Sequence, residues 1–75
     1  MVDRAMLIDH LQMARRHVEL GLEHIAKQKA IIARLERKNR DANLARELLD
    51  TLEDTQRMHV ADCERLEKEL AGNDF

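Results

Sequence analysis

The hydrophobic positions of this chain fall into two stripes of helical spacing, separated by a short polar break. In each stripe the positions recur mostly in alternating steps of three and four residues, which puts them on one face of an α-helix. The first stripe consists of Leu7, Leu11, Ala14, Val18, Gly21, Ile25, Gln28, Ile32 and Leu35. The second consists of Ala45, Leu48, Leu49, Leu52, Gln56, His59, Cys63, Leu66 and Leu70. The pattern therefore predicts two long amphipathic helices.

The residues around the break predict where the helices begin and end. Asp3 and Asp41 can cap the two helices, because their carboxylates accept hydrogen bonds from free backbone N–H groups. Asn39 tolerates the left-handed backbone conformation that ends many helices. We expect the first helix over residues 4–38, a turn over 39–41, the second helix over 42–71 and a frayed tail over 72–75. A turn this short makes the helices antiparallel, so residues 1–75 form one domain, an all-α, coiled-coil-like hairpin.

A turn centred near residue 40 sets the pairing between the helices, because the numbers of facing residues then add up to about 80. This register pairs Gly21 with His59 and Val18 with Cys63. Glycine costs about 1 kcal/mol relative to alanine inside a helix, so we expect Gly21 to leave room for the imidazole ring. Polar residues in an apolar seam need hydrogen-bond partners and can fix register and oligomeric state. We assign that role to Gly21, Gln28, Gln56 and His59.

The composition indicates that the hairpin associates with further helices. The chain has 75 residues, of which 37% are charged, and it has no proline. Two helices side by side bury only the seam between them, which is too little to offset the ordering entropy of the chain. Further apolar residues lie outside the seam, namely Met6, Met13, Leu22, Ile31, Leu44 and Met58. We therefore expect a homodimer, in the form of an antiparallel four-helix bundle.

Charge is distributed unevenly, although the net charge is only −2. Residues 27–40 carry six basic side chains against Glu36, and the chain after Asp41 is predominantly acidic. In a hairpin the basic segment lies at the turn and the acidic one extends to the open end. This polarity would suit an antiparallel mate or an anionic partner, or it is an ordinary solvated surface. The candidate partner-binding residues are Arg34, Arg37, Lys38 and Arg40.

Metal binding is a weaker hypothesis. His59 and Cys63 are four residues apart, which lets two side chains of one helix share a metal, and the register brings His17 close. These three ligands would suit zinc with one open position. Lone cysteine and histidine residues on apolar faces, however, usually pack. His10 and His24 continue a heptad row with His17, but neighbours in that row are about 10 Å apart along the axis. We predict no cofactor.

The chain resembles a group of small bacterial helical-hairpin proteins over His17 to Leu66. The residues that carry the resemblance are His17, Val18, Gly21, Ile25, Gln28, Ile32, Leu35, Asp41, Ala45, Leu48, Leu49, Leu52, Thr55 and His59. The chain departs from that pattern in having Asn39-Arg40 in place of the usual loop glycine, Gln56 for an aliphatic residue, and Cys63 for a basic or polar one. Similar hairpins occur alone or beside bacterial signalling domains. The resemblance implies a regulatory or scaffolding interaction module.

No group of residues predicts catalysis, because a helical seam offers neither a cleft nor oxyanion donors. We therefore expect a non-enzymatic module that binds itself and another protein, with a signalling protein as the candidate partner. The alternative is a dimeric hairpin that binds structured RNA through basic residues, as small plasmid-copy-control hairpin proteins do. With one cysteine, no signal peptide and no apolar run near the ~20 residues that span a bilayer, we expect a cytoplasmic protein without a membrane segment.

Overall fold

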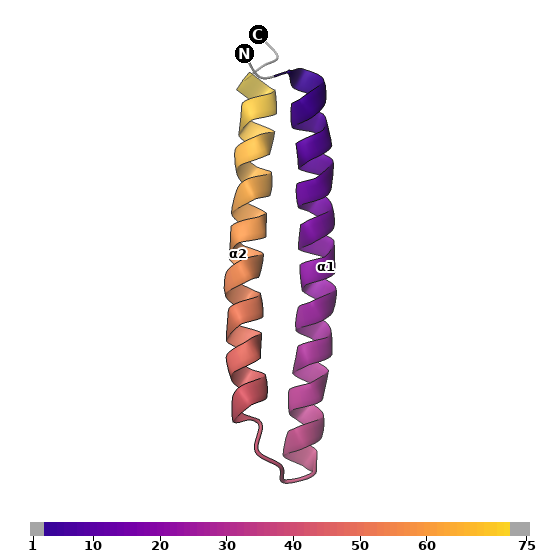
Figure 1. The fold of residues 1–75 in the computed structure, drawn as a ribbon, viewed down its shortest axis with the longest axis vertical. Helices are drawn as coiled ribbons and strands as arrows, with labels where there is room; N and C mark the ends of the chain where they lie inside the picture. Colours follow the sequence, from indigo (N-terminus) through magenta and orange to yellow (C-terminus); the bar gives the residue numbers. More distant parts are fainter. Residues whose placement is uncertain (1–2, 73–75) are drawn as a thin grey trace.

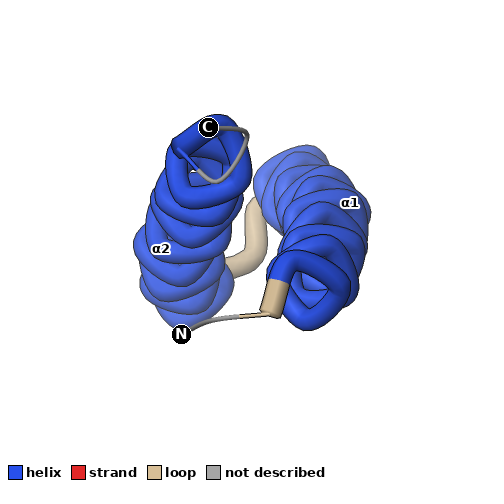
Figure 2. Tube along the Cα trace, turned by 90° about the horizontal axis from the view of Figure 1, so that it is seen from above, coloured by secondary structure: helices blue, strands red, loops and turns tan. Residues whose placement is uncertain are grey.

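The computed structural model describes residues 3–72, which form two antiparallel helices (Figure 1). Helix α1 spans Arg4–Arg37 and helix α2 spans Asn43–Gly72. They lie side by side in a rod with Cα extents of 58 × 14 × 14 Å. Seen end on, the described part of the chain places no third element against them (Figure 2). The predicted all-α hairpin is confirmed.

Local capping chemistry explains the two ends of α1. The Asp3 carboxylate accepts a hydrogen bond of 3.1 Å from the N–H of Ala5, as predicted for the N-cap. At the other end, Asn39 has a left-handed φ of 54°. The N–H of Asn39 then donates to the carbonyl of Glu36, and the N–H of Arg40 donates to the carbonyl of Leu35. These two bonds form a Schellman motif, with asparagine in the position that usually holds glycine.

The turn is longer than the sequence predicted. It occupies residues 38–42 rather than 39–41, because α1 ends at Arg37 instead of residue 38 and α2 begins at Asn43 instead of residue 42. The Asp41 carboxylate still caps α2, accepting a 2.9 Å hydrogen bond from the Asn43 N–H. Ala42, before the helix, is buried. At the far end Gly72 is helical rather than part of a tail, and the predicted tail residues 73–75 lie outside the described residues.

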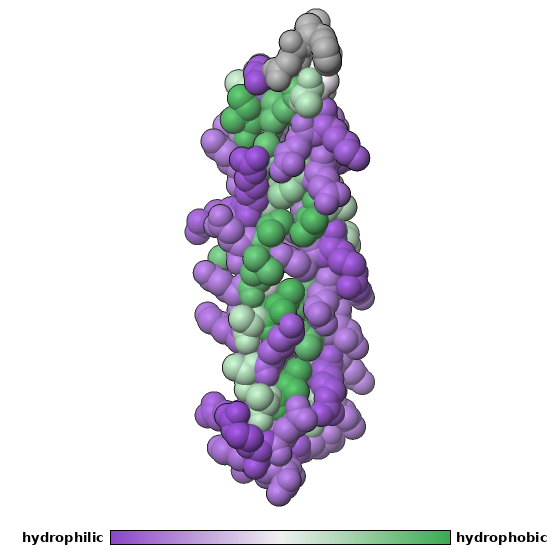
Figure 3. Space-filling view, turned by 180° about the vertical axis from the view of Figure 1, so that it is seen from behind, coloured by the Kyte–Doolittle hydropathy of each residue, from purple (hydrophilic) through white to green (hydrophobic). Residues whose placement is uncertain are grey.

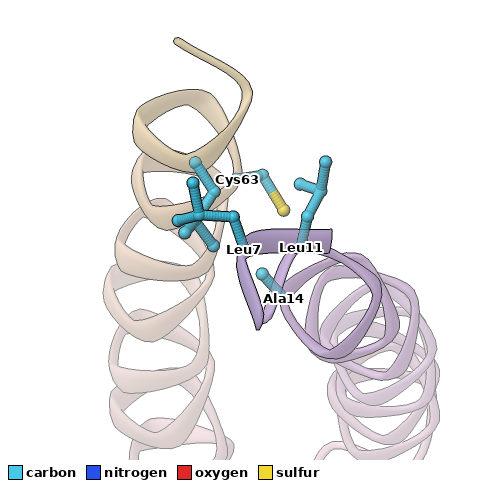
Figure 4. Close-up of a cluster of buried hydrophobic side chains, with 5 residues drawn as sticks. Leu7, Leu11, Ala14 and Cys63 are labelled. Atoms are coloured by element: carbon cyan, nitrogen blue, oxygen red, sulfur yellow. The ribbon is translucent and has the colours of Figure 1, made fainter. Parts of the chain in front are cut away.

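The hydrophobic core is thin. Five buried residues form one cluster at the open end of the hairpin, namely Leu7, Leu11, Ala14, Cys63 and Leu66. Figure 4 shows this open-end cluster, in which the sulfur of Cys63 points from α2 toward α1. Within residues 3–72 no side chain is completely buried. On the face shown in Figure 3, hydrophobic atoms form a strip along the rod between hydrophilic flanks, so the seam is visible from outside.

Candidate interaction surfaces

Two glutamines cross the middle of the seam. Nε2 of Gln28 donates a 2.9 Å hydrogen bond to the carbonyl oxygen of Ala45, and Nε2 of Gln56 donates one of 2.9 Å to that of Val18. Both glutamines are more than nine-tenths buried, with 7% and 9% of their surface exposed. Each amide therefore ties its helix to one height on the other helix, which is the arrangement that a register-fixing role requires.

Gly21 makes room for Gln56, and the predicted pairing of Gly21 with His59 is wrong. A Cβ atom on Gly21 would lie 2.8 Å from Cδ and 3.4 Å from Nε2 of Gln56, and closer still to Oε1. That oxygen is buried and has no hydrogen-bond donor among the described residues. It lies against the Cα of Gly21, where a weak Cα–H···O contact is the interaction open to it.

The register differs from the prediction because part of the turn is extended. Gly21 with Gln56, and His17 with His59, have numbers that add up to 77 and 76 rather than about 80. Residues 40–42 are not helical, and an extended residue advances about 3.3 Å against 1.5 Å in a helix. This segment runs back along the rod before α2 begins, so α2 starts nearer to the open end than α1 ends (Figure 1).

Two histidines meet across the seam near its middle. The ring centroids of His17 and His59 are 5.2 Å apart, and the rings are tilted by 44°. The pair lines a shallow hollow of about 190 Å³ together with His24, Leu20 and residues around Gln56. His10 lines the next hollow toward the open end, again with His17. The heptad row of α1 therefore borders the seam on one side, as its spacing predicts.

Cys63 does not join these histidines. It lines a hollow on the other side of the seam, with Arg15, Val60 and Glu67. Burial, and then the nearby charge of Glu67, raise the pKa of the Cys63 thiol above its ordinary value. A protonated thiol is a poor nucleophile and a poor metal ligand.

The weak zinc hypothesis therefore loses its third ligand. Its premise was that the register would bring His17 to both His59 and Cys63, whereas the structure brings together only the two histidines. Within residues 3–72 no group of three His, Cys, Asp or Glu side chains is arranged to hold a metal ion.

The predicted basic residues surround a hollow at the turn end. This hollow has a volume of about 250 Å³ and is lined by Ile31, Arg34, Leu35, Lys38 and Arg40, while Arg37 lies outside it. All four predicted cations are exposed, and within the described chain none forms a salt bridge. Arg34 and Arg37 also lie in the last turn of α1, where positive charge stabilises the free carbonyl groups. The charges are thus open to an anionic group.

Most of the exposed apolar surface lies on the histidine side of the seam. We call this side the histidine face and define it by two rows on each helix, spaced by seven residues. Its α1 rows are Met6, Met13, Leu20, Lys27, Arg34 and His10, His17, His24, Ile31; its α2 rows are Leu44, Thr51, Met58, Arg65 and Leu48, Thr55, Asp62, Glu69. Of ten exposed large hydrophobic residues among residues 3–72, seven lie in these rows. Sequence reasoning missed Leu20 and counted Leu48 in the seam.

The opposite side, which we call the thiol face, carries the remaining three, Ile8, Leu22 and Val60. Two salt bridges join the helices, Arg15 to Glu67 at 3.7 Å and Arg46 to Glu36 at 3.3 Å. The members of the two pairs on each helix are three heptads apart, so both bridges lie on one side. That side is the thiol face, because Arg15 and Glu67 line its hollow with Cys63. Among the salt bridges of the described residues, none crosses the histidine face.

Comparisons with known protein families, with curated proteins and with solved structures find no match to this chain. The resemblance to bacterial helical-hairpin proteins therefore stays a prediction. Neither helix, over the residues that the structure describes, is long and apolar enough to cross a membrane.

Proposed function

We propose that the chain is a non-enzymatic protein–protein interaction module, with a regulatory or scaffolding role, that works as part of a larger helical bundle. The observation that carries this proposal is the exposed apolar surface of a hairpin whose own core is thin. Leu44, Met58 and Met13 expose 81%, 69% and 59% of their surface. Large hydrophobic residues that recur along one face of a helical rod favour an interaction site over an ordinary solvated surface.

The chemistry of the seam supports a binding role over catalysis. The Nε2 groups of Gln28 and Gln56 donate to backbone carbonyls, and burial raises the pKa of the Cys63 thiol. The three hollows along the seam are shallow and are lined by side chains of both helices. A helix of a partner fits such a surface better than a small substrate does, because its side chains pack between the existing ones.

The experiment that tests the proposal is sedimentation of the chain at micromolar concentration, combined with circular dichroism and thermal unfolding at several concentrations. We expect a helical assembly whose melting temperature rises with concentration, because association stabilises the folded state by mass action. A compact, fully helical monomer whose melting temperature is independent of concentration would contradict the proposal.

The basic turn end favours a second candidate, an anionic partner such as structured RNA. Substituting Arg34, Arg37, Lys38 and Arg40 together by glutamine is expected to leave the fold intact, because exposed charges seldom contribute more than about 1 kcal/mol each. The same variant is expected to bind RNA or an acidic protein more weakly and with a flatter salt dependence. Binding titrations at two salt concentrations measure both effects. Unchanged affinity in the variant would exclude the turn end as the site.

A further inference from the structure

The two long faces of the hairpin differ in how they meet solvent. On the thiol face, Arg15 with Glu67 and Arg46 with Glu36 bridge the helices with exposed ion pairs. On the histidine face, Asp62 and Glu69 form salt bridges only within α2, both to Arg65. Between those charges and the turn, this face presents the exposed apolar side chains of Leu20, Ile31, Leu44, Leu48 and Met58, with Lys27 and Arg34 beside them. Among the described residues, therefore, no salt bridge connects the two helices across the histidine face.

The size of this face matches a specific protein–protein contact. With Cα extents of 58 Å by 14 Å, one long face offers roughly 800 Å², which is about what each partner contributes to a standard interface. A single helix is about 10 Å across with its side chains, so it would leave part of the face uncovered, because the Cα extent alone is 14 Å wide. A partner that covers the whole face is itself about two helices wide.

We propose that a second copy of this chain covers the histidine face, related by a two-fold axis parallel to the hairpin. The inference rests on the proposed function and names its partner, its face and its orientation. Under this axis α1 of one copy packs on α2 of the other, with their turns at the same end. Neighbouring helices in the resulting bundle are all antiparallel.

The apolar residues in the middle and the turn half of the face are self-complementary under this axis. Residues at one height in the hairpin have numbers that add up to about 77, and the axis preserves height. Leu20 then meets Met58 of the second copy, and Ile31 meets Leu44 and Leu48 of the second copy. All five residues are among the exposed hydrophobic residues. Each of these contacts occurs twice because of the symmetry.

The polar residues of the face agree with the same axis. His10 comes opposite Glu69 of the second copy, and His17 comes opposite Asp62 of the second copy. Among the salt bridges of the described residues, these two carboxylates pair only with Arg65 of the same helix. The distances are 3.0 Å for Glu69 and 3.6 Å for Asp62. An imidazole N–H can donate to a carboxylate oxygen, so the charges at the open end gain partners on association.

The opposite orientation fits less well, although the uneven charge distribution of the sequence would suit it. With the turns at opposite ends, α2 faces α2 of the second copy about the middle of the helix. Leu48 would then lie against Arg65 and Glu69 of the second copy, and Leu44 would lie beyond them near the helix end. Burying charged groups against aliphatic side chains is unfavourable. The aliphatic residues of the turn half would thus lose their apolar partners.

A matched pair of variants tests the face. Met58→Lys and Leu22→Lys each place a charge at an exposed residue, 69% and 58% exposed, on the histidine face and the thiol face respectively. We expect Met58→Lys to raise the dimer dissociation constant at least about tenfold, because it puts a charge into the contact. Leu22→Lys is expected to change it less than about threefold, which is within the range of surface substitutions.

Distances between spin labels test the orientation. The variant Arg37→Cys with Cys63→Ala carries one exposed thiol near the turn. The proposed axis puts the two labels at the same end of the bundle, at a distance well below the 58 Å length of the rod. Labels separated by nearly that length would overturn the orientation. Circular dichroism of the unlabelled variant checks that it folds.

The outcomes separate this inference from the proposed function. A dimer that Leu22→Lys breaks and Met58→Lys does not would leave the interaction module standing and overturn the histidine face as its contact. A chain that stays monomeric alone but folds onto a different helical protein would overturn the second copy as the partner. A stable, fully helical monomer would overturn both proposals.

Discussion

The two halves of the seam hold the helices together by different chemistry. The open-end cluster is aliphatic apart from one thiol, and all five of its residues are at least about nine-tenths buried. The middle of the seam instead contains Gln28 and Gln56, each hydrogen-bonded to a backbone carbonyl of the other helix. Apolar contacts are non-directional and scale with area, whereas a hydrogen bond requires one donor at one height.

This difference explains how a hairpin with a narrow seam can have a single register. Sliding the helices by one turn would replace one apolar contact by another in the open-end cluster. The same slide would leave the amide of Gln56 without the Val18 carbonyl and would place it against a residue that has a Cβ, unlike Gly21. A buried polar group without a partner costs about 1–3 kcal/mol. The aliphatic half therefore stabilises the hairpin, and the glutamine half disfavours the other registers.

The largest expected effect comes from the open-end cluster. Leu66 is 5% exposed, and Leu66→Ala removes buried methyl groups and leaves a cavity. We expect a loss of about 2–5 kcal/mol in the free energy of unfolding, measured by urea denaturation. The control is Leu22→Ala on the thiol face, where the leucine is 58% exposed and the loss should stay below about 0.5 kcal/mol. Equal losses in the two variants would show that the cluster is not the stabilising half.

The next effect concerns the contact of Gly21 with Gln56. Gly21→Leu is expected to destabilise by about 1–3 kcal/mol through overpacking, despite the better helix propensity of leucine. The physical reason is that any Cβ at this position displaces the buried amide of Gln56. Thermal or urea unfolding measures the change, and a raised melting temperature would show that Gly21 does not face the seam.

A double-mutant cycle tests the same contact, because the effect of Gly21→Ala on stability should differ between the natural chain and a Gln56→Ala background. In the natural chain Gly21→Ala loses the fit to Gln56, which offsets the gain in helix propensity or exceeds it. In a Gln56→Ala background the obstacle is gone, so Gly21→Ala should stabilise by about 1 kcal/mol. Residues in contact show coupling of this kind, whereas distant residues do not. Equal effects of Gly21→Ala in both backgrounds would rule out the contact.

The sequence predicted the features that depend on local chemistry. The helices follow from the spacing of apolar residues, and the caps at Asp3 and Asn39 follow from the preferences of single residues at helix ends. The basic turn end was predictable as well, because its charges are close together in the chain. Three of its four residues line the hollow there.

The features that depend on the path of the turn were not predictable in the same way. Whether residues 40–42 continue a tight turn or extend along α1 depends on the burial of Ala42, which is a tertiary contact. That choice shifted the pairing by three to four residues, moved Gln56 opposite Gly21 and paired His17 with His59 rather than with Cys63. The apolar row on the histidine face did have a signal in the sequence, since Met6, Met13 and Leu20 are spaced by seven residues.

The smallest expected effect is the response of the open-end cluster to alkaline pH, through the thiol of Cys63. Burial raises the pKa of this thiol above its ordinary value, and the charge of Glu67 adds to the effect. A group whose pKa is raised in the folded state stabilises the fold fully below its ordinary pKa. That contribution is lost as the pH rises through the raised value, because the folded state then has to bury a thiolate.

We therefore expect the free energy of unfolding to fall more steeply for the natural chain than for Cys63→Ala between about pH 8 and about pH 10. The comparison cancels the titration of lysine side chains, which both proteins share. Labelling with a thiol reagent gives a second measurement. Cys63 should react slowly in the folded chain, and Leu66→Ala should speed the reaction, because it opens the cluster that covers the sulfur. If the free energy of unfolding depended on pH in the same way in both proteins, and Cys63 reacted quickly in the folded chain, the open-end cluster would not shield the sulfur of Cys63 from water.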